Sequence, residues 1–480
     1  MDPNKIMEAV NLLVSLVGKD RVKTEKGEMA AYSRDVFMPG FLDLRLGKIS
    51  RLPAAVCYPK STEEVAKIVA KLKENRIPII PFGAGSGVLG GAVPSEEQQA
   101  IIMDLKKMDK IRCVSKTNLT CEAEAGIIGE ILERELNRQG FTLGHFPSSI
   151  YCSTLGGWLS TRSAGQLSAK YGKIEDLVLS LEGVLADGSE FHTRATPRCA
   201  TGPDLNQVLV GAEGTLGIIT AATVAISPLP ATQIFRGFGF EDVQSGLAAM
   251  RNLVQKELVP AALRLYDPVD TAFNQKKLSG PEKGCLLVVG YEGANMEMTA
   301  LKSELGFKLL SQMGGKDLGE APGQAWLKHR YAVSYNLSKV MFQPGNLLDT
   351  IEVSVVWRDA LALYQKIMEK IGKLGLVMAH FSHAWRDGVC IYFSFMVNDQ
   401  GADQEKLREK HGLAWQAAME SCLEIGASIS HHHGIGSFRS QWLKKELGPG
   451  HELLQRIKKQ IDPENIFNPG KLGLGEGKND

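Results

Sequence analysis

Three segments rich in glycine, serine and threonine, at residues 81–91, 147–165 and 211–219, constrain most strongly how this 480-residue chain can fold. Glycine lets backbone N–H groups approach an anion closely, and successive N–H groups form a cradle for phosphate oxygens. All three segments fall in one region of alternating predicted strands and helices. They predict loops that together hold one extended ligand, although any one of them alone could be an ordinary turn.

The first segment contains a literal G-x-G-x-x-G pattern from Gly85 to Gly90, directly after a predicted strand at 77–82. The dinucleotide-binding fingerprint requires a helix that begins at this loop, because the helix dipole must meet the pyrophosphate. Here Pro94 follows closely and the next predicted strand begins near residue 101. The spacing leaves no room for a helix, so we reject a Rossmann-type site.

The order of predicted elements suggests four parts and an α+β fold class. A helical lead covers residues 1–48, and an α/β region covers 49–230 and ends at a pair of prolines. Residues 231–425 alternate strands with long amphipathic helices, which indicates a cap domain with an antiparallel sheet flanked by helices. Residues 426–480 again have a composition typical of loops, and they contain three consecutive histidines.

Composition excludes several classes of protein. Lys and Arg total 55 against 54 Asp and Glu, and this net charge of +1 lacks the basic excess of a nucleic-acid-binding protein. No apolar stretch approaches the roughly 20 residues of a membrane span. The eight cysteines include no C-x-x-C pair, so zinc ribbons and iron–sulfur clusters have no support. Scattered cysteines and the lack of a signal segment predict a cytoplasmic protein.

Four ordered motifs carry a resemblance to a known family, at residues 81–87, 153–165, 171–178 and 213–219. They resemble the PCMH-type FAD-binding domain of the vanillyl-alcohol oxidase superfamily. The resemblance implies that 49–230 is a two-subdomain FAD-binding domain, with the cap over the flavin ring. Some members bind the flavin covalently through a histidine of the first loop. This chain has none between 81 and 91, so noncovalent FAD is expected.

The family's FAD-contacting stretches map onto residues of all three glycine-rich segments. These residues are Pro81, Phe82, Gly83, Ala84, Gly85, Ser86, Gly87, Ser148, Ser149, Ser153, Thr154, Gly157, Thr161, Arg162, Ser163, Ala164, Glu213, Gly214, Thr215, Leu216, Gly217, Ile218 and Ile219. The resemblance implies that they bind the cofactor.

Four stretches of the chain resemble the alkyldihydroxyacetonephosphate synthases, at residues 160–165, 201–204, 390–393, and 430–436 followed by 441–444. This branch makes ether lipids by exchanging an acyl for an alkyl group at a flavin N5 adduct. The catalytic residues that the resemblance implies are Tyr392, His431, His432, His433 and Arg264.

The chemistry of these residue types agrees with such roles. A tyrosine with a pKa near 10 needs a neighbouring cation or imidazole to act as a base at neutral pH. In an extended segment His431 and His433 would share one face and His432 would take the other. Arg264 would supply a permanent charge for an anionic substrate or for reduced flavin.

One departure concerns the arginine with which this branch holds phosphate. Alignment places Lys339 there, and a lysine binds phosphate as a point charge without a bidentate fork. We expect Lys339 and Arg264 to contact a small or lipid-like anionic substrate. A homo-oligomer is also expected, peripheral contact with a membrane is compatible with such a substrate, and no metal-ligating residue is assigned.

A rival branch is the FAD-linked D-2-hydroxy-acid dehydrogenases of the lactate and glycolate type, which also share the glycine loops. They would pass electrons to a quinone or flavoprotein acceptor. Many carry a metal site, and a divalent site from His380, His383 and the histidine triplet is the corresponding alternative here. A noncatalytic FAD-binding subunit of a larger complex is a third interpretation.

Overall fold

The computed structural model describes residues 3–49, 51–95, 99–332 and 343–475 of the chain. Its first sheet has the order β1-β2-β4-β3, in which β2, β4 and β3 run parallel and β1 is antiparallel. The strands are β1 (Val22–Lys23), β2 (Ala55–Cys57), β3 (Ile79–Phe82) and β4 (Ile101–Asp104). Helices α1 (Pro3–Val17) and α4 (Thr62–Glu74) belong to the same hydrophobic cluster as this sheet. The Ser61 side chain caps α4 by accepting the N–H of Glu64, as serine before an acidic first turn predicts.

The second sheet is antiparallel, with five strands in the order β5-β6-β10-β8-β9. They are β5 (Ile111–Ser115), β6 (Thr120–Glu124), β8 (Val178–Val184), β9 (Glu190–His192) and β10 (Ile218–Ala225). The helices of this region are α5 (Gly129–Arg138), α6 (Leu155–Thr161), α7 (Ser168–Tyr171), α8 (Ile174–Leu177) and α9 (Asn206–Leu209). A two-stranded ribbon pairs β7 (Phe141–Thr142) with β11 (Ser227–Pro228).

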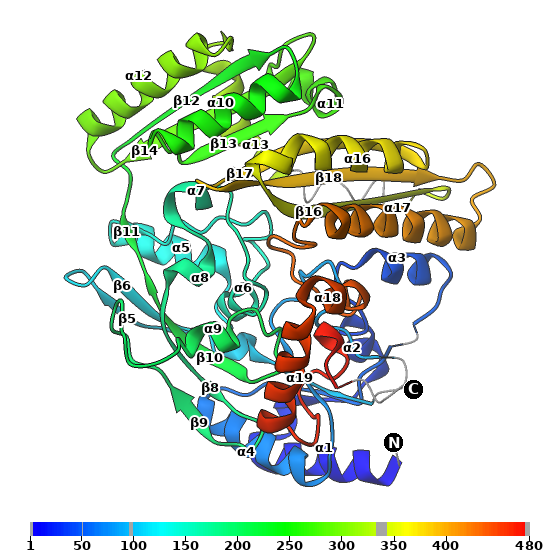
Figure 1. Cartoon of the computed structure of the whole chain (residues 1–480). Coiled ribbons are helices and arrows are strands. Elements are labelled where there is room, and N and C mark those ends of the chain that lie inside the picture. The colour runs from blue at the N-terminus through cyan, green and yellow to red at the C-terminus, as the bar shows by residue number, and fades with distance from the viewer. Residues whose placement is uncertain (1–2, 50, 96–98, 333–342, 476–480) are drawn as a thin grey trace.

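The third sheet is also antiparallel and has seven strands in the order β15-β12-β14-β13-β17-β18-β16. They are β12 (Thr232–Phe240), β13 (Ala262–Tyr266), β14 (Cys285–Gly293), β15 (Lys316–Asp317), β16 (Asn346–Val356), β17 (Gly375–Ala384) and β18 (Gly388–Asn398). Its helices are α10 (Val243–Gln255), α11 (Pro268–Leu278), α12 (Met296–Gln312), α13 (Ala321–His329), α16 (Ala360–Gly372) and α17 (Gln404–Ile425). This layer forms the upper half of the molecule in Figure 1.

The last helices, α18 (Ser440–Leu447) and α19 (Pro449–Ile461), return to the lower half beside the first two sheets (Figure 1). The chain then pairs with β3 through a bridge between Ile79 and Phe467. Two short helices precede the first parallel strand, α2 (Lys26–Ala31) and α3 (Met38–Arg45). The C-terminal segment therefore completes the region that carries the glycine-rich loops.

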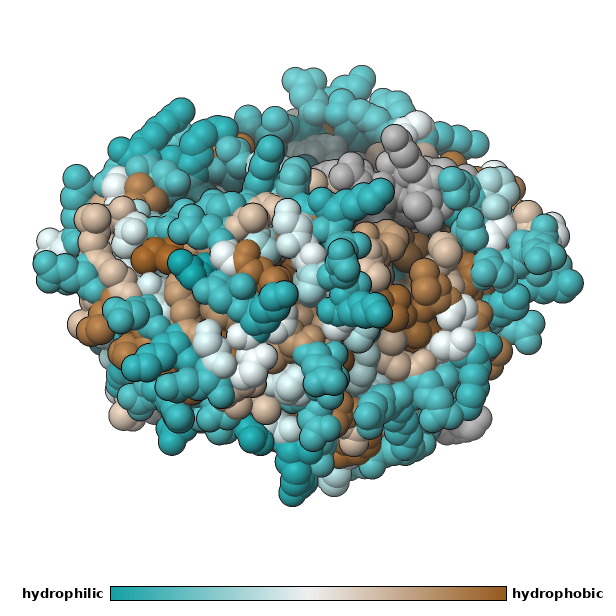
Figure 2. Space-filling view, turned by 90° about the horizontal axis from the view of Figure 1, so that it is seen from above, coloured by the Kyte–Doolittle hydropathy of each residue, from teal (hydrophilic) through white to brown (hydrophobic). Residues whose placement is uncertain are grey.

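The mixture of helices with largely antiparallel sheets confirms the α+β fold class. The described residues between β3 and β4, 83–95 and 99–100, form no helix, in agreement with the rejection of a Rossmann site. Strands β12, β13 and β17 and helix α12 were not predicted from the sequence. In the described ranges, no helix is both long and apolar enough to cross a bilayer. Seen from above the third sheet, the surface is mainly hydrophilic with separate hydrophobic clusters (Figure 2).

A buried lysine fixes α19 to the third glycine-rich segment. The ammonium of Lys458 donates to the carbonyls of Thr215 and Phe467 at 2.9 and 2.8 Å and to the Asp462 carboxylate at 2.5 Å. Lys458 is only 3% exposed and Asp462 only 2% exposed. Neither charge can therefore be solvated if the other is removed.

We expect Lys458→Met to lower the free energy of unfolding by about 3–5 kcal/mol, because it leaves a buried carboxylate unpaired. Urea denaturation followed by far-UV circular dichroism measures this loss. Lys459→Met, at the next and exposed position of α19, should change the value by less than about 0.5 kcal/mol. Equal effects of the two substitutions would contradict this role of Lys458.

Candidate functional site

The structure brings the three glycine-rich segments together. A methyl group added at Gly83 would lie 2.3 Å from Oγ1 of Thr154, so the first and second segments are in contact. A methyl group at Gly214 would lie 2.9 Å from the ring of Pro81, which joins the third segment to the first. The N–H of Glu213 also donates to the carbonyl of Ser160 at 3.0 Å. The three segments therefore form one composite site and are not three separate turns.

The loop after the histidine triplet closes on the same site through Glu213. Its carboxylate accepts the backbone N–H groups of Ile435 at 2.6 Å and Gly436 at 2.8 Å. The side-chain amide of Asn468 donates to the carbonyls of Glu213 and Gly91 at 2.7 and 2.9 Å. Burial raises the pKa of Glu213 to about 7, although these N–H donors oppose the shift.

The predicted cofactor residues of the second segment surround α6. Thr154 is the N-cap of this helix and its Oγ1 accepts the N–H of Gly157 at 3.2 Å. Arg162 ends the helix in a left-handed conformation and donates to the carbonyl of Val210 at 3.2 Å. Ser163 Oγ lies 2.8 Å from Nε2 of the buried His145. Thr154, Arg162 and Ser163 are thus all hydrogen-bonded within the protein.

The remaining predicted cofactor residues differ in whether their side chains or only their backbone groups could contact a cofactor. Residues 83–87 form an irregular loop, and Ser148 and Ser149 lie in the turn before α6. Phe82 contacts Gly85 within its own loop. The side chains of Leu216, Ile218 and Ile219 belong to the hydrophobic core, so these positions can present only backbone groups.

The composite site fits an extended phosphate-bearing cofactor such as FAD. Within the described residues, Nδ1 of His145, Oε1 of Gln166 and Oδ1 of Asn468 are buried without a hydrogen-bond partner. Glycines at 83 and 434 allow backbone approaches that a side chain would block, since their added methyl groups would lie 2.3 and 2.7 Å from neighbours. Unpaired polar atoms and open backbone are what such a ligand requires.

The histidine triplet is wrapped around one buried carboxylate. Glu352 in β16 accepts the N–H groups of His431, His432 and His433, the last two at 3.0 Å. Arg439 donates to the same carboxylate at 2.7 Å, and both charged side chains are 0% exposed. Burial opposes ionisation of Glu352, but Arg439 and His433 outweigh it and lower its pKa to about 2.

The predicted alternation of the three histidines is wrong. The rings of His432 and His433 both lie near Tyr392, with centroids 6.1 and 5.5 Å away. His431 instead accepts a hydrogen bond from the Trp385 indole at 3.1 Å. The segment is a loop whose successive N–H groups point at Glu352, so the period-two geometry of a strand does not apply.

Tyr392 lies in β18 directly opposite His380 of β17, and their rings stack at 4.9 Å with an interplanar angle of 11°. The tyrosine hydroxyl donates to Oγ1 of Thr350 at 3.1 Å. Burial raises the pKa of Tyr392 to about 12, although Thr350 and Arg264 oppose the shift. Tyr392 is therefore protonated at neutral pH. The hydroxyl of this predicted acid/base residue is a hydrogen-bond donor in this arrangement.

Of the two predicted cationic residues, Arg264 and Lys339, the structure describes only Arg264. Arg264 in β13 lies beside this group, with Nη2 2.6 Å from Nε2 of His380. Lys339 lies outside the described residues. Lys173, which the sequence did not single out, donates to the carbonyl of His431 at 2.7 Å. The turn between α7 and α8 thus contacts the triplet directly.

Four residues could hold a divalent metal ion, namely His383, Cys390, His431 and His432. Their ligand atoms lie within 4.8 Å of one another. A thiolate with imidazoles would suit zinc. His380, which the alternative metal set included, is not part of this group. The absence of a metal requirement stays a prediction.

Glu352 and Arg439 are the principal residues of this site that sequence reasoning missed, and His380 was considered only as a metal ligand. A single acid within the apolar run at 351–356 was the available signal, because a lone charge in a buried strand needs a partner. Nothing local in the sequence pairs His380 with Arg264, 116 residues away.

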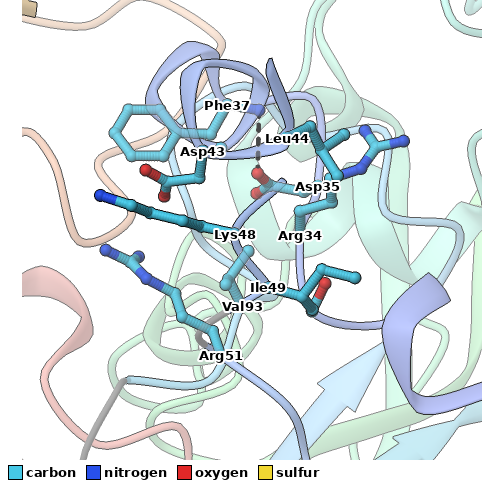
Figure 3. Close-up of a pocket in the computed structure, with 11 residues that line it drawn as sticks. Arg34, Asp35, Phe37, Asp43, Leu44, Lys48, Ile49, Arg51 and Val93 are labelled. Atoms are coloured by element: carbon cyan, nitrogen blue, oxygen red, sulfur yellow. Dashed lines mark hydrogen bonds between the residues drawn. The ribbon is translucent and has the colours of Figure 1, made fainter. Parts of the chain in front are cut away.

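A separate cavity of about 30 Å³ lies beside α3 and is bordered by charged side chains (Figure 3). It is lined by Ser33, Arg34, Asp35, Phe37, Gly40, Asp43, Leu44, Lys48, Ile49, Arg51 and Val93. Asp35 accepts the N–H of Phe37 at 2.9 Å, and burial raises the pKa of its carboxyl to about 6. None of the predicted site residues lines this cavity.

Comparisons with known proteins agree with this geometry. Residues 53–194 match the FAD binding domain, and residues 229–472 match the C-terminal domain of FAD linked oxidases. The chain is 35% identical to the alkyldihydroxyacetonephosphate synthase of Caenorhabditis elegans, over 90% of this chain and 78% of that protein. It is 28% identical to the D-lactate dehydrogenase of Anaerostipes hadrus, over 88% of this chain and 89% of that protein.

A solved structure of alkyldihydroxyacetonephosphate synthase has a TM-score of 0.81 at 27% identity, covering 96% of this chain and 84% of that one. These comparisons confirm the family resemblance that the motifs indicated. They also support FAD as the cofactor. With matches over both halves and a composite site that fits the cofactor, the chain belongs to the FAD-linked oxidase family and is an FAD-dependent enzyme.

Proposed function

We propose that this enzyme exchanges an acyl for an alkyl group on an acylated dihydroxyacetone phosphate, as an alkyldihydroxyacetonephosphate synthase. The observation that carries the proposal is the grouping of protonated Tyr392 with neutral His432 and His433 and with Arg264 around one site. The 35% identity to a synthase, against 28% to a D-lactate dehydrogenase, supports the same choice.

In this proposal residues 49–230 hold FAD without a covalent bond, and residues 231–425 and 426–480 supply the reacting side chains. The backbone of 83–87, the start of α6 and the turn at 213–215 would hold the cofactor. When bound, FAD supplies an electron-accepting ring system that permits substitution at the neighbouring carbon without net oxidation.

Each side chain has a role that follows from its charge and protonation state. Tyr392 can give its hydroxyl proton to the departing carboxylate oxygen, since it is protonated at neutral pH, and it can regain a proton from the hydroxyl group of the attacking alcohol. Burial lowers the pKa of His432 and of His433, so a neutral imidazole is available to take a proton from substrate. Arg264 and Lys339 would hold the anionic substrate, with Arg264 offering the directional N–H groups.

A second candidate is a D-2-hydroxy-acid dehydrogenase that passes electrons to a quinone or flavoprotein. The cluster of His383, Cys390, His431 and His432 favours it, because that cluster could hold a metal ion or provide a base. In this case the substrate is a small hydroxy acid and FAD is reduced in every turnover.

Anaerobic incubation of the FAD-loaded enzyme distinguishes the two candidates. We expect acyl-dihydroxyacetone phosphate and a long-chain alcohol to yield free fatty acid while the absorbance of oxidised flavin stays unchanged. Mass spectrometry of the products and visible spectroscopy measure both results. Bleaching of the flavin by D-lactate or glycolate, without fatty-acid release from the acylated ketone, would favour the dehydrogenase instead.

We expect Tyr392→Phe to lower the rate of acyl exchange by about 100- to 10,000-fold, because the proton donor is lost while the ring remains. FAD content, measured after denaturation, should stay at the wild-type level. Tyr291→Phe is the matched control, since its hydroxyl donates to the carbonyl of Leu258 at 2.9 Å and lies in the core. An unchanged rate in Tyr392→Phe would remove this residue from the mechanism.

A further inference from the structure

Three polar side chains form a continuous hydrogen-bonded chain that ends at Arg264. Oδ2 of Asp270 lies 3.0 Å from Nδ1 of His380, and Nε2 of His380 lies 2.6 Å from Nη2 of Arg264. Asp270 is 3% exposed and His380 is 9% exposed. None of the family motifs includes Asp270 or His380, and the proposed mechanism assigns them no role.

The contacts define the protonation of His380. A guanidinium offers only donors and keeps its charge at all physiological pH values. Nε2 must therefore accept from Arg264, and the single ring proton lies on Nδ1 and is donated to Asp270. Burial, followed by the charge of Arg264, lowers the pKa of His380 to about 4, which agrees with a neutral ring.

The fold holds Asp270 firmly at one end of this chain. Asp270 lies in the first turn of α11, where its N–H donates to the helix-capping carboxylate of Asp267 at 2.7 Å. Its second carboxylate oxygen accepts the side-chain amide of Asn274 at 2.6 Å. Both oxygens are thus engaged, and the carboxylate cannot rotate away from His380 without losing a buried hydrogen bond.

The other end of the chain faces the proposed substrate site. His380 occupies one terminal nitrogen of Arg264, while Nε of Arg264 is buried without a hydrogen-bond partner among the residues described. The same imidazole stacks on Tyr392 at 4.9 Å. One neutral ring therefore orients both the cation and the proton donor.

We propose that Asp270 and His380 are positioning residues that hold the Arg264 guanidinium and the Tyr392 ring for a substrate that carries a phosphate or carboxylate group. The inference rests on the proposed function, because it takes Arg264 as the group that meets the anion. Asp270 sets the tautomer of His380, His380 sets the direction of the Arg264 fork, and the free N–H groups of that fork meet the anion. Neither Asp270 nor His380 touches the substrate.

Calorimetric titration of the FAD-loaded protein with inorganic phosphate tests this chain without turnover. We expect Asp270→Asn to weaken phosphate binding by roughly 10-fold or more, because an amide can turn a donor toward Nδ1 and reverse the tautomer. Arg264→Met should abolish the binding. Unchanged affinity in Asp270→Asn, or no binding by the wild type, would overturn the proposal.

Asp267→Asn is the matched control for general damage to α11. Asp267 is buried and caps the same helix, and it accepts from the N–H of Ala379 and the hydroxyl of Tyr364 without touching His380 or Arg264. Asp267 also accepts the N–H of Asp270 through Oδ1, and the amide oxygen of an asparagine can still accept this hydrogen bond. Asp267→Asn should therefore bind phosphate as the wild type does, whatever stability it loses. Phosphate binding weakened equally in Asp267→Asn and Asp270→Asn would mean that the carboxylate acts only through the helix, and would overturn the proposal.

Steady-state kinetics of acyl exchange supply a second readout. Asp270→Asn should raise KM for the acylated substrate by roughly 10-fold or more and change kcat less, and it should add nothing in an Arg264→Met background. Additive effects would contradict action through Arg264. If the wild type shows no acyl exchange, the proposed function fails, and the phosphate titration still decides whether Asp270 and His380 position Arg264.

Discussion

The buried carboxylate of Glu352 holds together the part of the molecule on which the candidate site depends. It comes from a central region of β16, it is wholly inaccessible to water, and it pairs with the equally buried Arg439. Three consecutive N–H groups from the histidine triplet converge on it. A carboxylate in this position is tolerable only while all of these donors are present, so the strand and the loop must fold together.

A second buried carboxylate, Glu213, anchors the other end of the same loop. It accepts the N–H groups of Ile435 and Gly436, two and three residues after the triplet ends. Glu352 belongs to the seven-stranded sheet and Glu213 to the third glycine-rich segment. The triplet loop therefore spans the boundary between the cofactor region and the sheet above it, and burial at this boundary keeps its imidazoles uncharged.

Sequence reasoning succeeded where the physical requirement was local. Glycine at 83 and 214 allows close backbone approach, and the absence of room for a helix after Gly90 could be counted directly. It failed where a group's behaviour depends on distant partners. Burial raises the pKa of Tyr392, and the orientation of the triplet follows from Glu352, about 80 residues earlier in the chain.

The sequence by itself determined the α+β class and the three glycine-rich loops, and its resemblance to a known family singled out the tyrosine, the arginine and the histidines as candidate site residues. These conclusions depend on residue type and short spacing, which backbone sterics and hydrogen-bonding capacity translate directly into local structure. Only the tertiary structure decided which ring faces which, that the Tyr392 hydroxyl donates to Thr350, and that Asp270 reaches Arg264 through His380. Such properties arise from burial and from contacts across strands, and no spacing along the chain encodes them.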